Sequence, residues 1–259
     1  MTSQKTNKIA GILSKIFKND KLYIFFDMPK CAGNTIKENF YKNLKKEEIL
    51  EIYKPPFKTN QEIDRYIISI PEREKQKIKL IIGHHVYYGI HKFFDKDPIY
   101  LTFIRNPIDR TISHYNYALT QYKVKKEKNV FPTILSSKNK IITFKKWLKE
   151  NLFLHDMMCR MLYEDFYFTG VKKLEFSEID SENMKKILKK FYFIGLVENY
   201  EKDISYVFKK LRLSKKAKKQ NVSIKYIDPA DKSLRNFTKD FLKLDLKLYR
   251  YLIKKRGLI

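Results

Sequence analysis

The strongest constraint on the fold comes from residues 21–39, which read KLYIFFDMPKCAGNTIKEN. Residues 22–26 form a short apolar run rich in aromatic side chains, which is typical of a buried strand. A compact loop containing Pro, Gly and Asn follows, and a helical pattern begins near Ile36. The sequence therefore predicts a strand, a tight loop and a helix in direct succession.

This predicted arrangement suits an anion, because the first turn of a helix has unpaired backbone N–H groups and the positive end of the helix dipole. Gly33 lets a ligand come close to the backbone, Asn34 or Thr35 can cap the helix, and Lys30 adds a mobile cation. We expect a phosphate or sulfate group to bind here.

Strand and helix patterns alternate along the rest of the chain. Further strands are predicted at residues 79–82, 99–104 and 191–197, and helices at 36–50, 62–68, 108–121, 157–162, 200–211 and 234–255. Thr143 can cap a further helix that holds Trp147. Residues 122–142 are rich in Lys and lack periodicity, so we interpret them as a basic loop or flap. This alternation predicts an α/β fold, with a central parallel sheet flanked by helices, in one domain spanning residues 1–259.

Net charge and cysteine content indicate which kinds of partner the chain binds and which cellular compartment it suits. The net charge of +26 favours an anionic partner, although nine of the 55 basic residues are Arg and the Lys excess fits a general residue bias equally well. Two cysteines are too few for a disulfide framework, which favours a reducing, cytoplasmic setting. We interpret residues 1–20 as an N-terminal extension whose short apolar patch forms a packed or frayed helix, with peripheral membrane contact as the alternative. No segment approaches the ~20 apolar residues of a membrane span.

Two motifs together resemble the cosubstrate-binding motifs of sulfotransferases that use 3′-phosphoadenosine 5′-phosphosulfate (PAPS). The loop PKCAGNT is similar to the family's 5′-phosphosulfate loop, above all in the carbohydrate branch that includes the heparan 2-O type. Residues 105–113, RNPIDRTIS, are similar to its 3′-phosphate motif, in which an Arg ending a strand precedes a helical Ser by eight residues. Further similar segments are Gly83-His84, residues 88–91, Gly195 with Glu198, and residues 221–223.

The resemblance implies a P-loop-like three-layer fold, PAPS as cosubstrate and a hydroxyl acceptor on a carbohydrate or cell-surface glycan. Sulfuryl transfer moves a charged group in line between two oxygens, so catalysis consists mainly of positioning and charge neutralisation. Lys30 would hold the phosphosulfate oxygens, while Arg105 and Ser113 would bind the 3′-phosphate. The remaining loop contacts would come from Ala32, Gly33, Asn34 and Thr35. No metal is required.

The acceptor hydroxyl needs a general base, and a histidine is suited to this role near neutral pH. We predict His84, at the carboxyl end of a strand, as the base. Its neighbour His85 should point the other way on an extended chain, and it stays the alternative. We expect structural roles for His91, His114 and His155.

Two alternatives come from other protein classes. CAGNTIK resembles the Cys-loop of low-molecular-weight protein tyrosine phosphatases, with Cys31 as nucleophile and Asp97-Pro98 as the acid segment, but Lys37 stands where that chemistry needs Arg. A non-enzymatic nucleic-acid-binding protein would explain the charge alone, and no zinc-finger or RNA-binding signature supports it. A nucleotide kinase or GTPase is excluded by the lack of a Gly-x-x-x-x-Gly-Lys-Ser/Thr run. Residues 122–140 and 215–219 are candidate acceptor contacts or solvated surface.

Overall fold

The computed structural model describes residues 21–53, 57, 59–127, 132–163, 181–213 and 224–258. The expected N-terminal extension, the basic residues 215–219 and residues 221–223 therefore lie outside the described residues. So does the centre of the basic loop, at residues 128–131.

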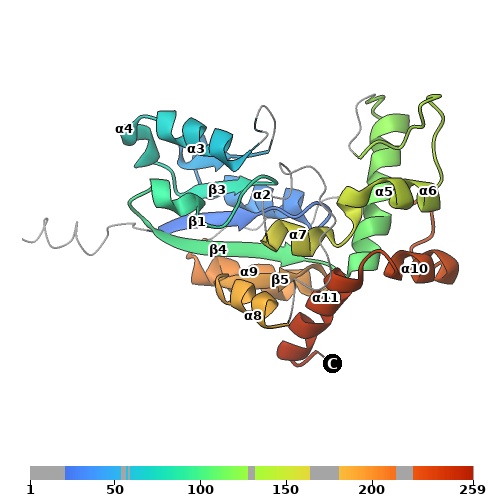
Figure 1. Cartoon of the computed structure of the whole chain (residues 1–259). Helices are drawn as coiled ribbons and strands as arrows, with labels where there is room; N and C mark the ends of the chain where they lie inside the picture. Colours follow the sequence, from blue (N-terminus) through green and yellow to red (C-terminus); the bar gives the residue numbers. More distant parts are fainter. Residues whose placement is uncertain are drawn as a thin grey trace, which may run out of the picture.

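A parallel five-stranded sheet forms the centre of the described part of the chain, in the order β2-β3-β1-β4-β5. The strands are β1 (Lys21–Phe26), β2 (Ile49–Glu51), β3 (Leu80–Gly83), β4 (Asp97–Ile104) and β5 (Phe193–Leu196). The predicted α/β class with a parallel sheet is thus confirmed. Figure 1 shows the helices arranged around this sheet.

Helices follow the strands in the expected alternation. They are α2 (Gly33–Tyr41), α3 (Asn60–Ser69), α4 (Glu72–Lys75), α5 (Pro107–Lys123), α6 (Phe144–Glu150), α7 (Met157–Tyr163), α8 (Ser181–Lys189), α9 (Tyr200–Lys210), α10 (Lys232–Lys239) and α11 (Lys243–Lys255). Short 3₁₀ turns lie at η1 (Lys46–Glu48), η2 (Ile90–Phe93), η3 (Leu152–Leu154) and η4 (Val197–Asn199). No helix among these is long and apolar enough to cross a bilayer.

The alternation of side chains along β1 divides the core between the two faces of the sheet. Leu22, Ile24 and Phe26 pack on one face with side chains from α3, α7 and α11. Tyr23 and Phe25 pack on the other face with side chains from α2 and α9. The result is the three-layer arrangement that the resemblance implied.

A separate cluster of buried side chains lies beyond the carboxyl end of β4. It joins α5, α6 and α10 around Trp147, and Figure 1 shows these helices together past the arrowhead of β4. The Asp109–Arg235 ion pair, with an N–O distance of 2.5 Å, ties α5 to α10. This helical group flanks the edge of the sheet at which parallel α/β proteins bind their ligands.

Two predicted helices were wrong in extent. Instead of a helix over residues 36–50, α2 ends at Tyr41 and the edge strand β2 follows, pairing Ile49 with Leu80 of β3. A three-residue strand is too short to show any alternation, so its pattern was absorbed into the helix. Instead of one helix over residues 234–255, α10 and α11 are separated at residues 240–242. A side chain distant in sequence, Asp156, accepts hydrogen bonds from the first turn of α11.

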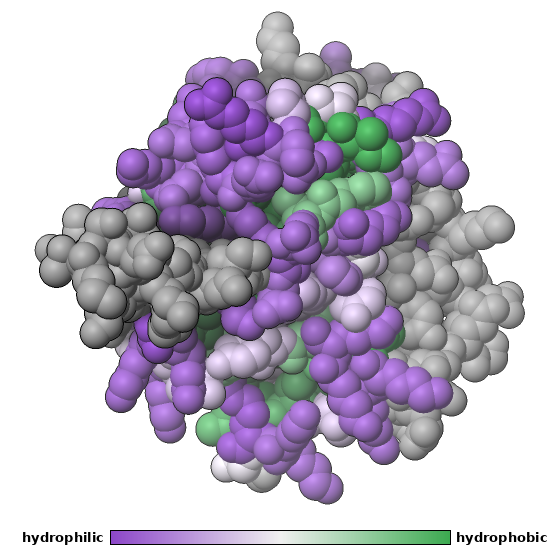
Figure 2. Space-filling view, turned by 90° about the vertical axis from the view of Figure 1, so that its left-hand side faces the viewer, coloured by the Kyte–Doolittle hydropathy of each residue, from purple (hydrophilic) through white to green (hydrophobic). Residues whose placement is uncertain are grey.

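The surface at the side of the molecule seen in Figure 2 is mostly hydrophilic. Its hydrophobic patches are small and separated from one another. Among the described residues, such a distribution is ordinary for a protein surface.

Candidate active site

The register of the sheet brings the polar residues after β1 and β3 together. Phe26 of β1 pairs with Gly83 of β3, so Asp27 and His84 each follow directly at the same edge. The Asp27 amide donates to the carbonyl of Gly83 at 3.2 Å, which extends the ladder by one bond. Because parallel strands end at a common edge, these two side chains face the same site.

The loop between β1 and α2 is tightly turned. Lys30 and Ala32 have positive φ values of 69° and 66°, and Ala32 occupies the N-cap of α2 with no side-chain cap. The prediction that Asn34 or Thr35 caps the helix was therefore wrong, because the helix begins at Gly33 and both residues lie within its first turn. The left-handed turn still directs the first N–H groups of α2 toward the edge of the sheet.

Gly33 is needed for a reason that the sequence did not suggest. A Cβ atom at this position would lie 1.8 Å from Oδ1 of Asp27. The buried carboxylate of Asp27 thus packs directly on the first residue of α2. Sequence analysis missed Asp27, although its place as the first polar residue after a buried strand was a signal.

Lys30 lies at the same edge with its charge partly withdrawn from water. Its Nζ atom is 4.1 Å from the ring centroid of Tyr117 on α5. Burial and the neighbouring charge of Arg105 lower the pKa of Lys30 to about 8, while Cys31 acts in the opposite direction. A cation above an aromatic face is stabilised by the ring quadrupole.

Arg105, the first residue after β4, contacts the Lys30 loop. Its Nη1 atom donates to the backbone oxygen of Lys30 at 3.5 Å. The side-chain oxygen of Asn106 then caps α5 by accepting from the Ile108 and Asp109 amides. The backbone amide of Asn106 donates to the Glu198 carboxylate at 2.6 Å. The two cationic residues predicted from separate motifs therefore lie side by side.

Ser113 is half-buried on α5, one helical turn before Tyr117. Residues four apart lie on the same face of a helix, so Ser113 shares the face on which Tyr117 meets Lys30. His114, the next residue, is buried against Trp147. Burial and the charges of Arg110, Lys30 and His84 hold the pKa of His114 well below its usual value, so this ring is neutral.

The two adjacent histidines contact different parts of the chain. Nδ1 of His84 is 2.5 Å from the backbone oxygen of Asp27, and its ring packs edge-on against Tyr53 at 5.0 Å. The backbone amide of His85 donates to Ile52, and burial lowers the pKa of its ring to about 4, against a hydrogen bond to the Tyr53 backbone. His84 thus contacts the start of the loop after β1.

Two other histidines hydrogen-bond within the fold. Nδ1 of His91 lies 2.7 Å from the Tyr100 hydroxyl, and Nε2 of His155 lies 2.8 Å from the Leu148 carbonyl. These contacts agree with the structural roles expected for both.

Comparison with known proteins identifies the family. A profile of the sulfotransferase family matches residues 15–255. The chain belongs to the sulfotransferase family.

Solved structures similar to this sulfotransferase have low sequence identity. One is a sulfotransferase from Alicyclobacillus acidocaldarius, with 15% identity, a TM-score of 0.43 and coverage of 90% of this chain and 95% of that chain. Another is mouse sulfotransferase SULT7A1 complexed with PAP, with 13% identity, a TM-score of 0.33 and coverage of 92% and 85%. No curated protein matches the chain significantly.

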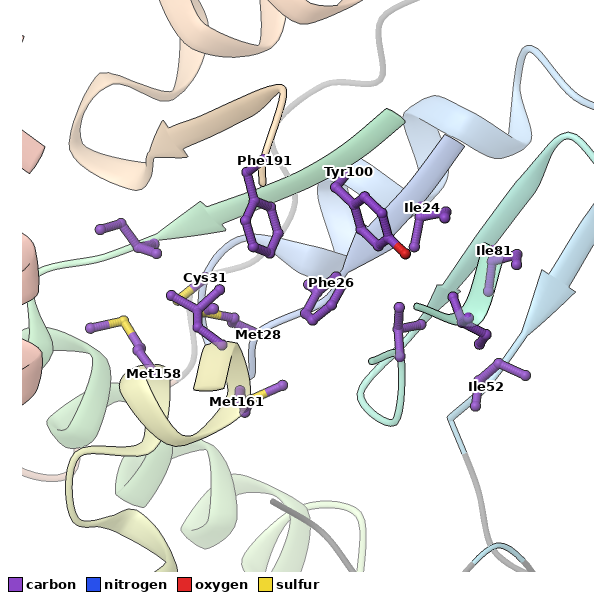
Figure 3. Close-up of a cluster of buried hydrophobic side chains, with 14 of the residues drawn as sticks. Ile24, Phe26, Met28, Cys31, Ile52, Ile81, Tyr100, Met158, Met161 and Phe191 are labelled. Atoms are coloured by element: carbon purple, nitrogen blue, oxygen red, sulfur yellow. The ribbon is translucent and has the colours of Figure 1, made fainter. Parts of the chain in front are cut away.

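The phosphatase alternative does not fit the surroundings of Cys31. Figure 3 shows Cys31 beside Met28, Met158 and Met161 in an apolar cluster, and burial raises the pKa of its thiol to about 12 against the charges of Arg110 and Arg105. A nucleophilic cysteine needs the thiolate, which this environment disfavours. Asp97, the proposed acid, pairs with Lys21 at the amino end of β1, opposite the loop.

The described residues of the sulfotransferase contain no cluster of His, Cys, Asp or Glu able to hold a metal ion. The cations at the site are side chains of the chain itself. Lys30 and Arg105 supply positive charge beside the first turn of α2. This combination is suited to an anionic, doubly phosphorylated ligand.

Proposed function

We propose that this sulfotransferase transfers the sulfuryl group of PAPS to a hydroxyl group of a carbohydrate, such as a cell-surface glycan. The observation that carries the proposal is the contact between Arg105 and the Lys30 loop, because it gives one ligand two cationic anchors. Membership of the family supports sulfuryl transfer as the reaction class, and the resemblance of both motifs to PAPS-binding sequences supports PAPS as the cosubstrate.

In this proposal the loop and α2 bind the 5′-phosphosulfate. Lys30 neutralises charge on the bridging and non-bridging oxygens as the sulfur–oxygen bond to the 5′-phosphate breaks. Backbone and side-chain donors surround the same group, supplied by Ala32, Gly33, Asn34 and Thr35. The planar guanidinium of Arg105 binds the 3′-phosphate, and the Ser113 hydroxyl donates one further hydrogen bond.

His84 acts as the general base toward the acceptor. The acceptor oxygen attacks sulfur while its proton passes to Nε2 of His84, and the electron pair of the broken bond leaves on the 5′-phosphate of 3′-phosphoadenosine 5′-phosphate (PAP). The contact of Nδ1 with the Asp27 carbonyl supports this assignment, because it directs the other ring nitrogen away from the backbone. No metal takes part in this step.

A carbohydrate acceptor is supported by the similarity of the loop to the heparan 2-O branch and by the positive charge of the chain. Polyanionic sugars are attracted to a basic surface. The basic residues 122–140 and 215–219 are the candidate contacts. The two cysteines are both buried and unbridged, which suits a reducing, cytoplasmic compartment.

Radiolabelled PAPS, incubated with the protein and a panel of glycans, tests this function directly. We expect label in a carbohydrate product and PAP as the second product. Lys30→Ala should lower kcat by about a hundredfold or more, as the loss of one charge-stabilising donor does elsewhere. Arg105→Ala should act mainly by raising the KM for PAPS.

Lys21→Ala is the matched control, because Lys21 lies on β1 at the end away from the loop and forms an exposed ion pair with Asp97. This variant should retain wild-type activity. Absence of labelled product with every acceptor, together with no binding of PAP, would contradict the proposed function. Release of inorganic phosphate that depends on Cys31 would revive the phosphatase alternative.

A further inference from the structure

We propose that Asp27 is a positioning residue that fixes the orientation of His84 and stabilises the imidazolium formed when His84 takes the acceptor proton. This inference rests on the proposed function and deepens it. It assigns a role to a buried carboxylate that neither cosubstrate motif includes.

The backbone of Asp27 sets the tautomer of His84. Nδ1 of His84 lies 2.5 Å from the Asp27 carbonyl oxygen. A carbonyl oxygen can only accept a hydrogen bond, so Nδ1 must carry the proton in the neutral ring. Nε2 is then the nitrogen with the lone pair, as a general base requires.

The side chain of Asp27 adds a negative charge beside the same ring. Oδ2 lies 3.9 Å from Nδ1 of His84, and the residue as a whole is 4% exposed. When Nε2 takes a proton, the positive charge spreads over the ring and faces this carboxylate. Attraction between such charges is stronger in a water-poor site than on the surface.

The carboxylate is held in place from two directions. The Tyr53 hydroxyl donates to Oδ2 at 2.8 Å, and Lys37 lies over the Tyr53 ring at 4.3 Å. On the other side, Gly33 has no side chain, and this leaves the space that Oδ1 fills. The segment after β2 and helix α2 therefore converge on a single carboxylate.

The charges around Asp27 oppose the cost of its burial. Burial raises the pKa of Asp27, while the charge of His84, the hydrogen bond from Tyr53 and the charge of Lys37 act against that rise. An unpaired buried carboxylate would be unfavourable. While His84 is neutral, the Tyr53 hydrogen bond and the charge of Lys37 offset part of this cost, and the charge of His84 is added when its ring takes the acceptor proton.

The cycle balances without another reactant. The acceptor proton moves to Nε2, the other proton stays on Nδ1 and is donated to the Asp27 carbonyl, and the new S–O bond replaces the bond to the 5′-phosphate. After PAP leaves, Nε2 returns its proton to water. Asp27 makes no contact with the reacting atoms in this scheme.

Asp27→Asn tests the charge while keeping the backbone carbonyl. We expect kcat for sulfuryl transfer to fall between about tenfold and a hundredfold, less than for loss of the base itself. The dissociation constant for PAP should stay within about twofold, because the cosubstrate anchors are untouched. Tyr53→Phe should lower kcat in the same direction by a smaller factor, because it loosens the carboxylate without removing it.

Asp203→Asn is the control for general damage to the fold. Asp203 is also buried, and its carboxylate on α9 pairs with Arg256 and accepts from the Leu196 amide of β5. This variant should lower the melting temperature and leave kcat per folded molecule unchanged. If the wild type transfers sulfate and Asp27→Asn has the same kcat, the role of Asp27 is overturned while the proposed function stands.

A measurement of the His84 tautomer separates this inference from the proposed function. Nitrogen-15 NMR of the imidazole should show protonated Nδ1 in the neutral ring, in the wild type and in Asp27→Asn alike. A ring protonated at Nε2 would overturn the positioning role, whatever the activity. A wild type that transfers no sulfate to any acceptor would instead overturn the proposed function.

Discussion

Lys30 is the residue in which backbone, packing and charge meet most directly. Its left-handed backbone turns the chain into α2, its ammonium lies over Tyr117, and its backbone oxygen accepts from Arg105. Burial and the charge of Arg105 lower its pKa to about 8, so the site loses a positive charge at mildly alkaline pH.

We therefore predict that PAP binds more weakly as the pH rises through about 8. The ammonium form binds the anion, so deprotonation of Lys30 above its pKa of about 8 removes affinity. At pH 9 the dissociation constant should be roughly tenfold higher than at pH 7. Isothermal titration calorimetry measures this, and Lys30→Arg should show a flat profile because Arg stays charged. A wild-type profile equally flat would contradict the prediction.

We predict that the aromatic ring of Tyr117 affects the pKa of Lys30. Its π face stabilises the protonated form of Lys30, so Tyr117→Leu should lower the pKa of Lys30 by roughly half a unit to one unit, as a cation–π contact of about 1 kcal/mol implies. The alkaline loss of PAP affinity would then begin at a lower pH. Tyr117→Phe, which keeps the ring, is the control and should match the wild type. Equal profiles for the Leu and Phe variants would exclude this role.

The sequence predicted those site residues that are marked by a pattern within their own segment. Lys30, Arg105 and His84 each follow a recognisable apolar run, and the structure brings all of them to one edge. The close approach of a ligand at Gly33 stays a prediction, and the structure adds a second reason for this glycine, the space that its missing side chain leaves. The atom that needs this space belongs to Asp27, and the packing of a carboxylate on a helix start has no signature in either segment alone.

At the scale of elements, α7 and α11 cap each other. Asp156, just before α7, accepts from the amides of Leu244 and Asp245 at the start of α11. Asp245 accepts in turn from the amides of Met158 and Cys159 at the start of α7. Each helix thus gains the acceptors that its own sequence lacks, and two buried carboxylates come close together.

This reciprocal cap makes stability depend on pH. Burial and the charge of Asp245 raise the pKa of Asp156 from 3.8 to about 7, and burial also raises that of Asp245. Between pH 3.8 and about 7 the folded chain therefore holds more protons than the unfolded chain. The free energy of unfolding consequently falls as the pH rises toward 7. We predict a higher melting temperature near pH 6 than near pH 7.5, measured by calorimetry.

Asp156→Asn is the matching variant, because its amide oxygen still accepts from both α11 amides while the carboxyl charge is gone. The contribution of this pair to the pH dependence should disappear, leaving a flatter curve. Asp156→Ala, which removes the acceptor, should cost about 0.5–2 kcal/mol. An unchanged slope in the Asn variant would show that the pH dependence arises elsewhere.

The length of a strand or helix largely decided whether the sequence predicted it. The long apolar runs of β1 and β4 and the capped helices α5 and α6 lie where the sequence placed them, including the Thr143 cap. The three-residue β2 was missed, since its extended backbone depends on pairing with β3. The break between α10 and α11 was missed because helical spacing continues across it, while the cap that restarts the helix comes from Asp156.

At the scale of the whole molecule, the site joins the ends of β1, β3 and β4 and the helix that follows β4. A ligand that spans Lys30 and Arg105 would link these separate segments. Because such a ligand binds only the folded chain, it should stabilise the fold by mass action.

We predict that PAP at about a hundred times its dissociation constant raises the melting temperature by roughly 5–10 °C, from a gain of about 2.7 kcal/mol. Differential scanning calorimetry measures the shift. Adenosine 5′-phosphate at the same concentration should give a smaller shift, because it lacks the 3′-phosphate that Arg105 is proposed to bind. In Arg105→Ala the two nucleotides should give equal shifts, whereas a persistent preference for PAP would remove Arg105 from that role.

The sequence by itself determined the α/β class, the parallel sheet and the edge at which the cationic residues gather. These depend on patterns within single segments, namely apolar runs, their lengths and the first polar residues after each run. Only the tertiary structure decided which atoms meet there: Lys30 over Tyr117, Asp27 between Gly33 and His84, and the exchange of caps between α7 and α11. The physical reason is that each of these contacts joins residues from different segments, whose approach is set by strand register and helix packing rather than by local propensity.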